Sequence, residues 1–361
     1  MEPSKFLGVV PDPRSEMEKA QDWQHDEIAA AAPGPVTWVE KPITALRRFP
    51  KRNQTSSLSC MAQSGAKALG IENVVEEGTF VELSALPVYR ARSNFPNGGM
   101  FQQDLFSILS KPTACLEKDM PSQGMNENQM NTAPVSMNDA MKQLAEYYRA
   151  NGYMFLPAGN IDQMAGILDQ GKAVHLLMYF MPDEWWRPYP TIIYPGLSND
   201  SNASHHGITA VDRTLWQGKK ALLIEDSAGN DTSIDGTGQR ILTEDFLMQR
   251  CYGAGYLLFK KNADATVPKP KHYFTKRSLF FGLMNDPEVA ALQKILQYET
   301  FLPYSLNGNL LPLGNMLQMT CAGLKKWQVK HGIMDFATEP DVRKVRFGPK
   351  SIGLANSLYA N

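Results

Sequence analysis

A cysteine, a histidine, an aspartate and a glutamine stand where their side chains could carry out nucleophilic chemistry together. Cys60 lies near the start of residues 59–69, whose small helix-forming residues predict a helix that stops at Gly70. A thiol in the first turn of a helix experiences the positive end of the helix dipole, which favours the thiolate. A lone cysteine also packs well in an apolar core, so Cys60 alone does not establish a nucleophile.

Three further residues supply support for a reactive site. His206 opens a predicted strand over residues 207–211, and Asp226 follows the next predicted strand. Two neighbouring strands would bring this histidine and this carboxylate together at one end of a sheet, as a base and the group that orients it. Gln54 precedes the cysteine by six residues, and its amide could donate toward an oxygen held beside the sulfur.

The elements that would position these residues are helices first and strands later. The spacing of apolar residues predicts helices over residues 102–110 and 137–151. Short apolar runs bounded by Gly, Asp and Asn predict strands over residues 173–180, 207–211, 220–224 and 255–259. This order predicts an α+β domain with a helical lobe and a β lobe, between which a cleft could form.

Composition and charge narrow the class of protein. The chain has 361 residues, 43% of them apolar and 20% charged, which is long enough for two domains and unlike a disordered chain. Lys and Arg (36) balance Asp and Glu (37) to a net charge of −1, which argues against wholesale binding of nucleic acid or anionic membranes. The longest apolar stretch, residues 173–181, is too short to span a bilayer. The four cysteines match neither a disulfide framework nor a zinc site, as expected for a protein made in a reducing compartment.

Several segments of the body match, in order, the motifs of one known family. They are Gln54-Thr-Ser-Ser-Leu-Ser-Cys60-Met61, Asn97-Gly98-Gly99, His206-Gly-Ile-Thr-Ala-Val-Asp212, Glu225-Asp226-Ser-Ala-Gly229 and the N-terminal Gly8-Val-Val-Pro-Asp-Pro13. The separation between the cysteine and the histidine (206 − 60 = 146) falls within the ~130–150 residues typical of that family. From residue 8 to about residue 260, the chain resembles a papain-like cysteine peptidase of the microbial and phage type.

The resemblance implies a papain-like two-lobed fold and a role for each residue. His206 would deprotonate Cys60, and Asp226 would orient the imidazole. Gln54 and the backbone N–H of the cysteine would hold the oxyanion. The substrate cleft would be lined by Gly98 and Gly99. The implied reaction is the hydrolysis of peptide or protein amide bonds through a thioester, with no metal or organic cofactor.

The chain departs from the family's motifs beside the nucleophile and the base. Met61 and Ala228 stand where the family has tryptophans, and Leu58 replaces a glycine. Asp226 replaces an asparagine, which is a mild change because either side chain accepts from an imidazole N–H and the aspartate holds more positive charge on the ring. These departures favour an alternative function: a papain-like structural or interaction protein with little or no turnover, for example a component of a phage particle.

Other histidines and two tryptophans could also contribute. His205 is the rival base, but alignment with the family places the base directly before the Gly-Ile pair, which selects His206 and leaves His205 in a loop. His175 lies within an apolar predicted strand and is expected to be a core histidine. Trp185 and Trp186 are expected either to form a substrate-binding rim or interface patch, or to be partly buried against the body.

The C-terminal segment has the pattern of a small helical domain. Asp286 followed by Pro287 predicts the start of an amphipathic helix, a second helix is predicted over residues 322–328, and a third follows Phe347-Gly348-Pro349. This order resembles the three-helix peptidoglycan-binding module over nearly all of residues 286–361. Because the same apolar positions would pack any helical bundle, wall binding and a purely structural or protein-contact role both stay open.

The sequence therefore predicts four parts: an extended arm over residues 1–40, a papain-like domain over 41–261, a linker over 262–276 and a helical domain over 277–361. The N-terminus shows no signal peptide, so we expect a protein that is cytoplasmic when synthesised. A virion or lysis would then bring it to the cell envelope. Its expected partners are a peptide or protein substrate and either peptidoglycan or virion proteins, without nucleic acid or a membrane span.

Overall fold

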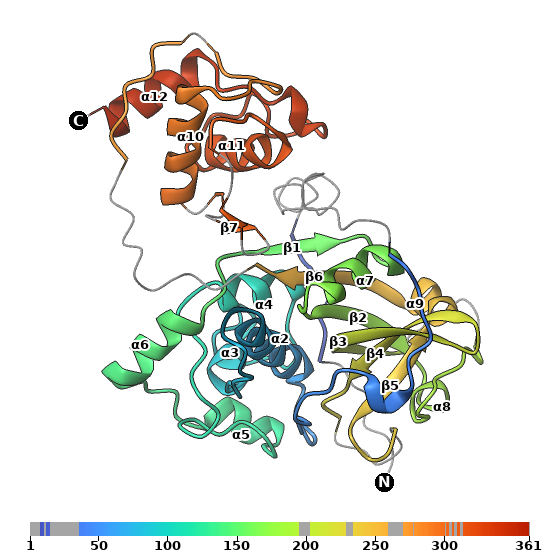
Figure 1. Cartoon of the computed structure of the whole chain (residues 1–361). Helices are drawn as coiled ribbons and strands as arrows, with labels where there is room; N and C mark the ends of the chain where they lie inside the picture. The colour runs from blue at the N-terminus through green and yellow to red at the C-terminus, as the bar shows by residue number, and fades with distance from the viewer. Residues whose placement is uncertain are drawn as a thin grey trace. The chain divides into compact units, whose positions relative to one another are not determined.

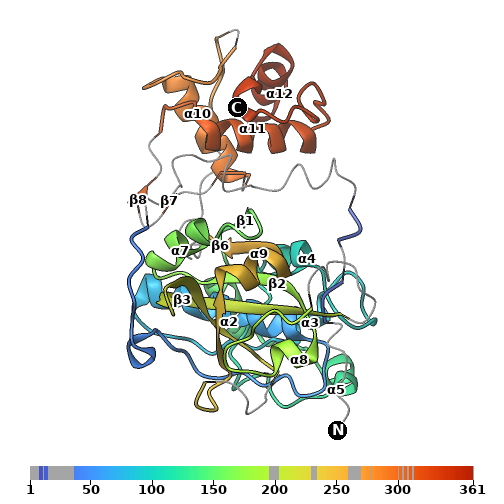
Figure 2. The same cartoon turned by 90° about the vertical axis from the view of Figure 1, so that its right-hand side faces the viewer.

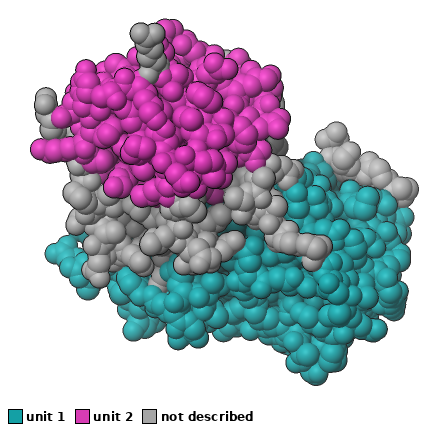
Figure 3. All heavy atoms as spheres, turned by 45° about the horizontal axis from the view of Figure 1, so that its top comes forward, with its two compact units in different colours: residues 1–12, 33–261 teal, residues 13–32, 262–361 magenta. Residues whose placement is uncertain are grey.

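The computed structural model (Figure 1) describes residues 8–10, 12–14, 36–194, 203–228, 234–258, 270–276, 278–299, 301–302, 305–306, 309–310 and 313–360. The chain divides into two units, residues 1–12 with 33–261 (unit 1) and residues 13–32 with 262–361 (unit 2), which Figure 3 colours separately. The alanine-rich part of the predicted arm, most of the predicted linker, and the predicted positions Gly229 and Phe259 lie outside the described residues.

An antiparallel sheet forms one half of unit 1. Its described strands lie in the order β1-β6-β2-β3-β4-β5. Their bounds are β1 (Tyr153–Leu156), β2 (Val174–Phe180), β3 (Ser204–Trp216), β4 (Lys219–Glu225), β5 (Gln239–Thr243) and β6 (Cys251–Leu257). The predicted strands correspond to β2, β3, β4 and β6, whereas β1 and β5 were not predicted from the sequence.

Helices form the other half of unit 1, and a few cover the sheet. The helical half contains α2 (Cys60–Glu77), α3 (Leu86–Arg90), α4 (Gln102–Leu109), α5 (Glu127–Thr132) and α6 (Asp139–Tyr148). The sheet half also carries η3 (Ile43–Ala45), α7 (Ile161–Asp169), α8 (Pro182–Trp185) and α9 (Glu244–Arg250). Both views place α2 to α5 together beside the sheet (Figures 1 and 2). The predicted α+β architecture with a helical and a β half is confirmed.

The central helix α2 begins where the sequence predicted but ends later. Cys60 is its first residue and Ser59 its N-cap, and the helix runs to Glu77 before Gly78 adopts a left-handed conformation with φ 73°. The predicted stop at Gly70 was wrong because this glycine serves packing rather than termination. A Cβ at residue 70 would lie closer than 3.0 Å to a backbone carbonyl of the following chain, an approach that a glycine permits.

Two buried ion pairs fasten α2 to the sheet. Lys67 on α2 pairs with Glu225 at the end of β4, and the two side chains are only 4% and 3% exposed. Farther along the helix, Glu72 pairs with Lys172, which precedes β2, at 2.6 Å. Because an unpaired charge in the interior is costly, these pairs strongly disfavour sliding or tilting of α2 on the strands.

Strand β3 lies directly against α2. The hydroxyl of Thr209 donates to the backbone carbonyl of Ser64 at 3.0 Å. One turn of the helix earlier, the sulfur of Met61 lies so close to Gly207 that a Cβ on this glycine would be only 2.5 Å from the sulfur. The glycine in β3 therefore allows the start of α2 and the start of β3 to approach closely, which is where Cys60 and His206 stand.

Unit 2 has helices at the predicted C-terminal positions. Its described elements are α10 (Pro287–Tyr298), β7 (Ser305–Leu306), β8 (Asn309–Leu310), α11 (Gln318–Lys330), η5 (Val342–Lys344) and α12 (Pro349–Tyr359). The side chain of Asp286 caps α10 by accepting from two backbone N–H groups, with Pro287 at the first helical position. Leu292, Leu324 and Trp327 are fully buried between these helices. In neither unit do the described helices include one long and apolar enough to cross a bilayer.

Candidate active site

Cys60 lies at the N-terminus of α2 and is fully buried. The other cysteines are separate from it and from each other, and all four carry free thiols. Burial raises the pKa of Cys115 and of Cys251 to about 11 and that of Cys321 to about 12. These three thiols are therefore protonated and inert near neutral pH.

The structure brings His206 and Asp226 together at the predicted end of the sheet. His206 lies near the start of β3 and Asp226 directly follows β4, which pairs with β3. The Nε2 atom of the imidazole hydrogen-bonds to Oδ1 of the carboxylate at 2.7 Å, and both side chains are buried. The Cys60 side chain is near enough to His206 to be one of the groups that raise the pKa of the imidazole. Because Nε2 is bonded to the aspartate, Nδ1 is the ring nitrogen left for the thiol.

The charges of this cluster support each other. Burial alone would lower the pKa of His206, but the carboxylate of Asp226 and the contact with Cys60 outweigh it and raise the pKa to about 10. Burial would likewise raise the pKa of Asp226, but the imidazolium and the guanidinium of Arg240 hold it well below its usual range. The structure therefore favours a positively charged His206 beside a negatively charged Asp226 at neutral pH.

Both oxygens of Asp226 are used. Oδ1 accepts from His206 and from the backbone N–H of Ala228 at 2.9 Å. Oδ2 accepts from the indole N–H of Trp185 at 2.9 Å and lies 3.7 Å from the guanidinium of Arg240. An aspartate can accept at both oxygens, whereas an asparagine would present an amide N–H to one of these donors.

Trp185, expected from the sequence to be a substrate-binding rim, an interface patch or a partly buried residue, is instead completely buried beside the His–Asp pair. Its ring lies edge-on to His206 with 5.9 Å between the ring centroids. The guanidinium of Arg240 lies over the Trp185 ring, 5.1 Å from its centroid. Trp185 thus covers one side of the His–Asp pair. Motif alignment could not find it, because it comes from α8, before the motif that carries the histidine.

Gln54 is held rigidly near the end of β4. Its side-chain nitrogen donates to the carbonyl of Ser57 at 3.0 Å, and its side-chain oxygen accepts from the hydroxyl of Ser227 at 2.6 Å. Its backbone N–H also donates to the carbonyl of Ser227. Since Ser227 follows Asp226, these bonds connect the loop before the nucleophile to the residues that orient the base.

The glycines predicted to bind substrate lie in a loop that precedes α4. Gly99 has a left-handed backbone (φ 78°), and its N–H donates to the hydroxyl of Tyr89 at 3.1 Å. The carboxamide of Asn94 donates to the carbonyls of Gly98 and Gly99. These hydrogen bonds fix the conformation of the loop, and the loop ends at Met100.

Leu58 lies between the loop before Cys60 and the glycine loop. Its backbone N–H donates to Glu127 at 2.7 Å. Its side chain reaches Gly98, and the terminal methyl group lies where a Cβ on that glycine would be. The space between the two loops, which a glycine at residue 58 would leave open, is filled by this leucine.

A short N-terminal segment, Gly8-Val9-Val10, lies directly beside the thiol. Its backbone pairs with Met100: the N–H of Met100 donates to the carbonyl of Gly8, and the N–H of Val10 donates to the carbonyl of Met100, both at 3.0 Å. A Cβ on Gly8 would lie closer than 3.0 Å to the sulfur of Cys60. Because this extended segment occupies the space at the thiol, Cys60 has no exposed surface in this structure.

Two other histidines of unit 1, His205 and His175, contact different partners. The expectation that His205 lies in a loop was wrong, because β3 begins at Ser204 and includes it. Its Nδ1 contacts the hydroxyl of Tyr252 at 3.2 Å and its ring packs against Tyr179. His175 is a core residue whose Nδ1 contacts the carboxamide of Gln102 at 3.1 Å. Burial and the charge of His206 lower the pKa of His175 to about 3, so it is neutral.

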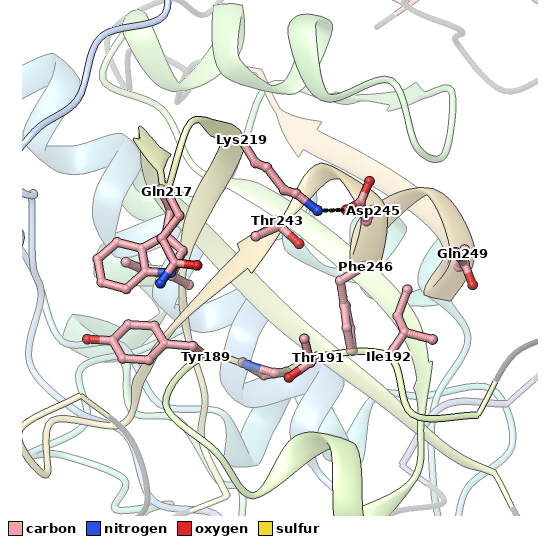
Figure 4. Close-up of a pocket in the computed structure, with 12 residues that line it drawn as sticks. Tyr189, Thr191, Ile192, Gln217, Lys219, Thr243, Asp245, Phe246 and Gln249 are labelled. Carbon is pink, nitrogen blue, oxygen red and sulfur yellow. Dashed lines mark hydrogen bonds and ion pairs between the residues drawn. The ribbon is translucent and has the colours of Figure 1, made fainter.

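A separate pocket of about 700 Å³ opens on the sheet half of unit 1 (Figure 4). Tyr189 and Trp216 stack on each other at one side of it, and Lys219 pairs with Asp245 across another. None of the predicted site residues lines this pocket, and Trp216 ends β3 at the end opposite to His206. Across the described residues, no three His, Cys, Asp or Glu side chains gather as a metal site would require.

Comparisons with known proteins agree with this geometry at the level of the fold. No family model matches the chain, and no curated protein matches it. Xylellain, a cysteine protease from Xylella fastidiosa, matches with a TM-score of 0.54 at 18% identity, over 71% of this chain and 97% of that chain. The chain therefore has the fold of papain-like cysteine proteases.

Two further solved structures are similar at lower scores. Digestive procathepsin L 3 of the Tenebrio molitor larval midgut has a TM-score of 0.48 at 16% identity, over 67% of this chain and 78% of that chain. The bromelain protease from Ananas comosus has a TM-score of 0.44 at 14% identity, over 58% of this chain and 94% of that chain.

Proposed function

We propose that unit 1 is a cysteine peptidase that hydrolyses peptide bonds through Cys60. The observation that carries the proposal is the buried chain of contacts from the thiol through His206 to Asp226. With the proton of the pair already on the imidazolium of His206, the sulfur attacks as a thiolate on the carbonyl carbon of the substrate. Asp226 keeps the imidazole oriented and stabilises its positive charge in this step.

The later steps use the same groups. The backbone N–H of Cys60 and the second amide hydrogen of Gln54 would stabilise the negative oxygen of the tetrahedral intermediate, because only one hydrogen of that amide is needed for the carbonyl of Ser57. The imidazolium of His206 then gives its proton to the leaving amine, which produces a thioester. Water, deprotonated by the same imidazole, hydrolyses the thioester and regenerates the thiol.

Turnover requires that the N-terminal segment leave the thiol. Gly8 lies against the sulfur and Val9 is buried, so a substrate chain can reach Cys60 only when these residues are displaced. The backbone N–H and carbonyl of Met100, which pair with the segment here, become available at that moment for an extended substrate. The substrate class that this supports is a polypeptide in an extended conformation.

Point variants test the proposed mechanism. Hydrolysis of an unfolded protein substrate by the full chain should be abolished in Cys60→Ala and in His206→Ala. The double variant should be no worse than either, since both residues serve one step. Asp226→Ala should retain more activity than these two. Far-UV circular dichroism of each variant controls for folding, and unchanged hydrolysis by a folded Cys60→Ala protein would sink the mechanism.

The second candidate is a catalytically silent papain-like interaction protein, such as a virion component. The observation that favours it is the complete burial of Cys60 beneath Gly8, together with the filling of the adjacent space by Leu58. For a scaffold, the variants Cys60→Ala and His206→Ala would leave every measurable property except stability unchanged. A substrate cleaved by the wild-type chain and not by Cys60→Ala would exclude this candidate.

For unit 2 we propose binding to peptidoglycan, which would hold the peptidase at the cell envelope. Support comes from a pocket of about 250 Å³ beside the Phe347-Gly348-Pro349 turn that the resemblance singles out, lined in part by Gln328, Asp335 and Arg346. The charged groups of Asp335 and Arg346 would bond to a glycan or a short peptide stem held there. Co-sedimentation of the full chain with purified sacculi tests it, and Arg346→Ala should weaken the binding. No sedimentation above that of an unrelated protein would contradict wall binding.

A further inference from the structure

The pocket on the sheet half of unit 1 lies far from the thiol (Figure 4). Trp216, which lines the pocket, follows His206 by ten residues along β3 (216 − 206 = 10). A strand advances about 3.3 Å per residue, which places Trp216 roughly 30 Å from the base. A molecule held in this pocket therefore takes no part in the proposed cleavage of a peptide bond.

The wall of the pocket formed by residues 189–192 is held in place at both ends. Directly before it, the carbonyl of Pro188 accepts from the backbone N–H of Ile241 at 3.2 Å. Directly after it, the next two backbone N–H groups donate to the carboxylate of Glu184. Glu184 is itself paired with Arg250 at 2.7 Å, and both side chains are buried. The pocket is therefore formed before any ligand binds, as sites for small molecules usually are.

The charges of the pocket cancel. Among the described residues that line it, the charged ones are Lys219 and Asp245, and these two pair with each other. An anion or a cation would find no unpaired countercharge here and would have to separate this pair in order to gain one. The pocket therefore favours a ligand without net charge.

The lining of the pocket combines an aromatic surface with neutral polar groups. The rings of Tyr189 and Trp216 stack with 4.4 Å between their centroids, and Tyr189 is 36% exposed. The polar groups are hydroxyls and carboxamides, which come from Thr191, Gln217, Thr243 and Gln249. A sugar ring has an apolar C–H face that packs on an aromatic ring, and its hydroxyls both donate to and accept from uncharged groups. This combination suits a saccharide.

An extended peptide is a poorer match for the same pocket. The strand that contributes to the pocket, β5, is the last of the described sheet, so a peptide would have to pair along its outer side. That side is already used, because Gln239 pairs with Ile234 and the N–H of Ile241 donates to Pro188. The strand therefore offers little free edge to a second chain.

Gln217 has a backbone conformation that favours other residues. It is the first residue of the two-residue turn between β3 and β4, with φ 52°, and Gly218 follows it with φ 77°. Turns of this type favour asparagine or glycine at the first position, because a longer side chain is strained there. Strained residues occur preferentially at functional sites, and this one lines the pocket.

We propose that this pocket binds a neutral oligosaccharide. A sugar ring packs against Tyr189 and Trp216, and its hydroxyls bond to the carboxamide of Gln217 and to the other uncharged polar groups of the lining. The volume of about 700 Å³ falls within the ~300–1,000 Å³ of small-ligand sites. The inference goes beyond the proposed peptidase and does not rest on it, since no bond of the saccharide is formed or broken.

Titrations of the full chain, followed by ligand-observed NMR, test the site. The neutral probes are maltotriose, cellotriose and triacetylchitotriose. Trigalacturonate is the charged comparison, and acetyl-Ala-Pro-Ala-Pro-amide is the neutral peptide. At least one neutral trisaccharide should bind with a Kd of about 1 mM or tighter, and the charged sugar and the peptide should bind at least about tenfold more weakly.

Gln217→Gly separates binding from folding. Glycine adopts the left-handed turn without strain, so this variant should be at least as stable to urea as the wild type. Its affinity for the trisaccharide should nevertheless fall by about three- to tenfold, because the carboxamide is lost. Trp216→Ala should weaken binding at least about tenfold. The control is Tyr273→Ala, which removes a ring that is 63% exposed in unit 2 and should leave the affinity unchanged.

The outcomes that would overturn the site are distinct from those that concern the peptidase. No binding of any neutral trisaccharide at about 10 mM, or tighter binding of trigalacturonate or the peptide, would contradict it. A folded Gln217→Gly or Trp216→Ala protein with wild-type affinity would also contradict it. Cys60→Ala should bind the trisaccharide as the wild type does, so a failure of the proposed peptidase leaves this result in place.

Discussion

The contacts of Asp226 explain why an aspartate suits this site, where the family that the chain resembles has an asparagine. Its Oδ1 accepts from His206 and from a backbone N–H, while its Oδ2 accepts from Trp185 and faces Arg240. Four donors surround two acceptor oxygens, and a carboxylate satisfies all of them. The tryptophan that shields the base comes from α8, and the carboxylate is what connects it to the base. The aspartate and Trp185 therefore act together at the base.

The charge of Asp226 should set the alkaline limit of the reaction. The carboxylate raises the pKa of His206, so the imidazole stays protonated until the pH approaches about 10. Since the leaving amine needs that proton, kcat/KM should fall as the pH rises through the pKa of His206. Asp226→Asn removes the negative charge and lowers the pKa, so the alkaline limb should move to lower pH by about one unit or more.

The measurement is kcat/KM for one peptide substrate from pH 5 to pH 10.5. Lys219→Gln, which removes an exposed cation far along β4, is the matched control and should leave the limb in place. An alkaline limb that stays at the wild-type pH in Asp226→Asn would show that the carboxylate does not control the charge of His206.

Helix α2 and strands β3 and β4 form the frame that holds the nucleophile against the base. The helix supplies Cys60, β3 supplies His206, and the buried pair of Lys67 with Glu225 connects the helix to β4 one residue before Asp226. Gly207 lets the strand approach the helix at the sulfur of Met61. The distance between the two reacting side chains thus depends on the packing of these three elements and not on a flexible loop.

Breaking the buried ion pair should destabilise unit 1. Glu225→Gln leaves the ammonium of Lys67 buried without a countercharge, which typically costs about 3–5 kcal/mol. The matched control is Asp245→Asn, because its pair with Lys219 is more than half exposed on both side chains, and exposed pairs contribute about 0–1 kcal/mol. The free energies of unfolding of the two variants are compared by urea unfolding of the full chain, monitored by its fluorescence. Equal losses in the two variants would contradict the structural role given to the buried pair.

The Gly8-Val9-Val10 segment is the element that covers the nucleophile. A methyl group on Gly8 has no room beside the sulfur, so Gly8→Ala must move the segment away. Overpacking of this kind costs about 1–3 kcal/mol, which should raise the population with an open thiol, and hence the alkylation rate of Cys60, by about tenfold. Gly353→Ala is the control, because a Cβ there would meet no atom within 4 Å. An alkylation rate unchanged from the wild type would show that the segment does not limit access.

At the scale of the whole molecule, the sequence predicted correctly those elements that a local pattern of residues marks. The cap and proline at Asp286 and Pro287 predicted the start of α10, and the short apolar runs predicted β2, β3, β4 and β6. His206 was chosen over His205 by a motif, and β3 indeed turns the two rings to different neighbours. The catalytic roles themselves stay predictions.

What the sequence could not provide are contacts made across the chain. Trp185 is 41 residues from the aspartate that it contacts, and no local pattern indicates such a pairing. Gly70 resembled a helix end because glycines often terminate helices. Its actual role is to leave room for a backbone carbonyl of a later segment, which the local sequence does not reveal. The strands β1 and β5 are short, and their place in the sheet is set by pairing with β6 and β4 rather than by their own residues. Tertiary packing overrode local preference in each case.

The central claim is that His206 makes Cys60 a nucleophile, and site-resolved alkylation tests it most directly. A thiol with the ordinary pKa of about 8.5 is less than ~1% thiolate at pH 6, so an unassisted cysteine reacts slowly there. We predict that iodoacetamide at pH 6 labels Cys60 about 100-fold faster than Cys115, Cys251 or Cys321, whose pKa values burial raises. In His206→Ala the rate at Cys60 should fall by at least about tenfold, because the group that favours its thiolate is gone. Equal labelling of all four cysteines in the wild-type chain, or a Cys60 rate that survives His206→Ala, would contradict the account.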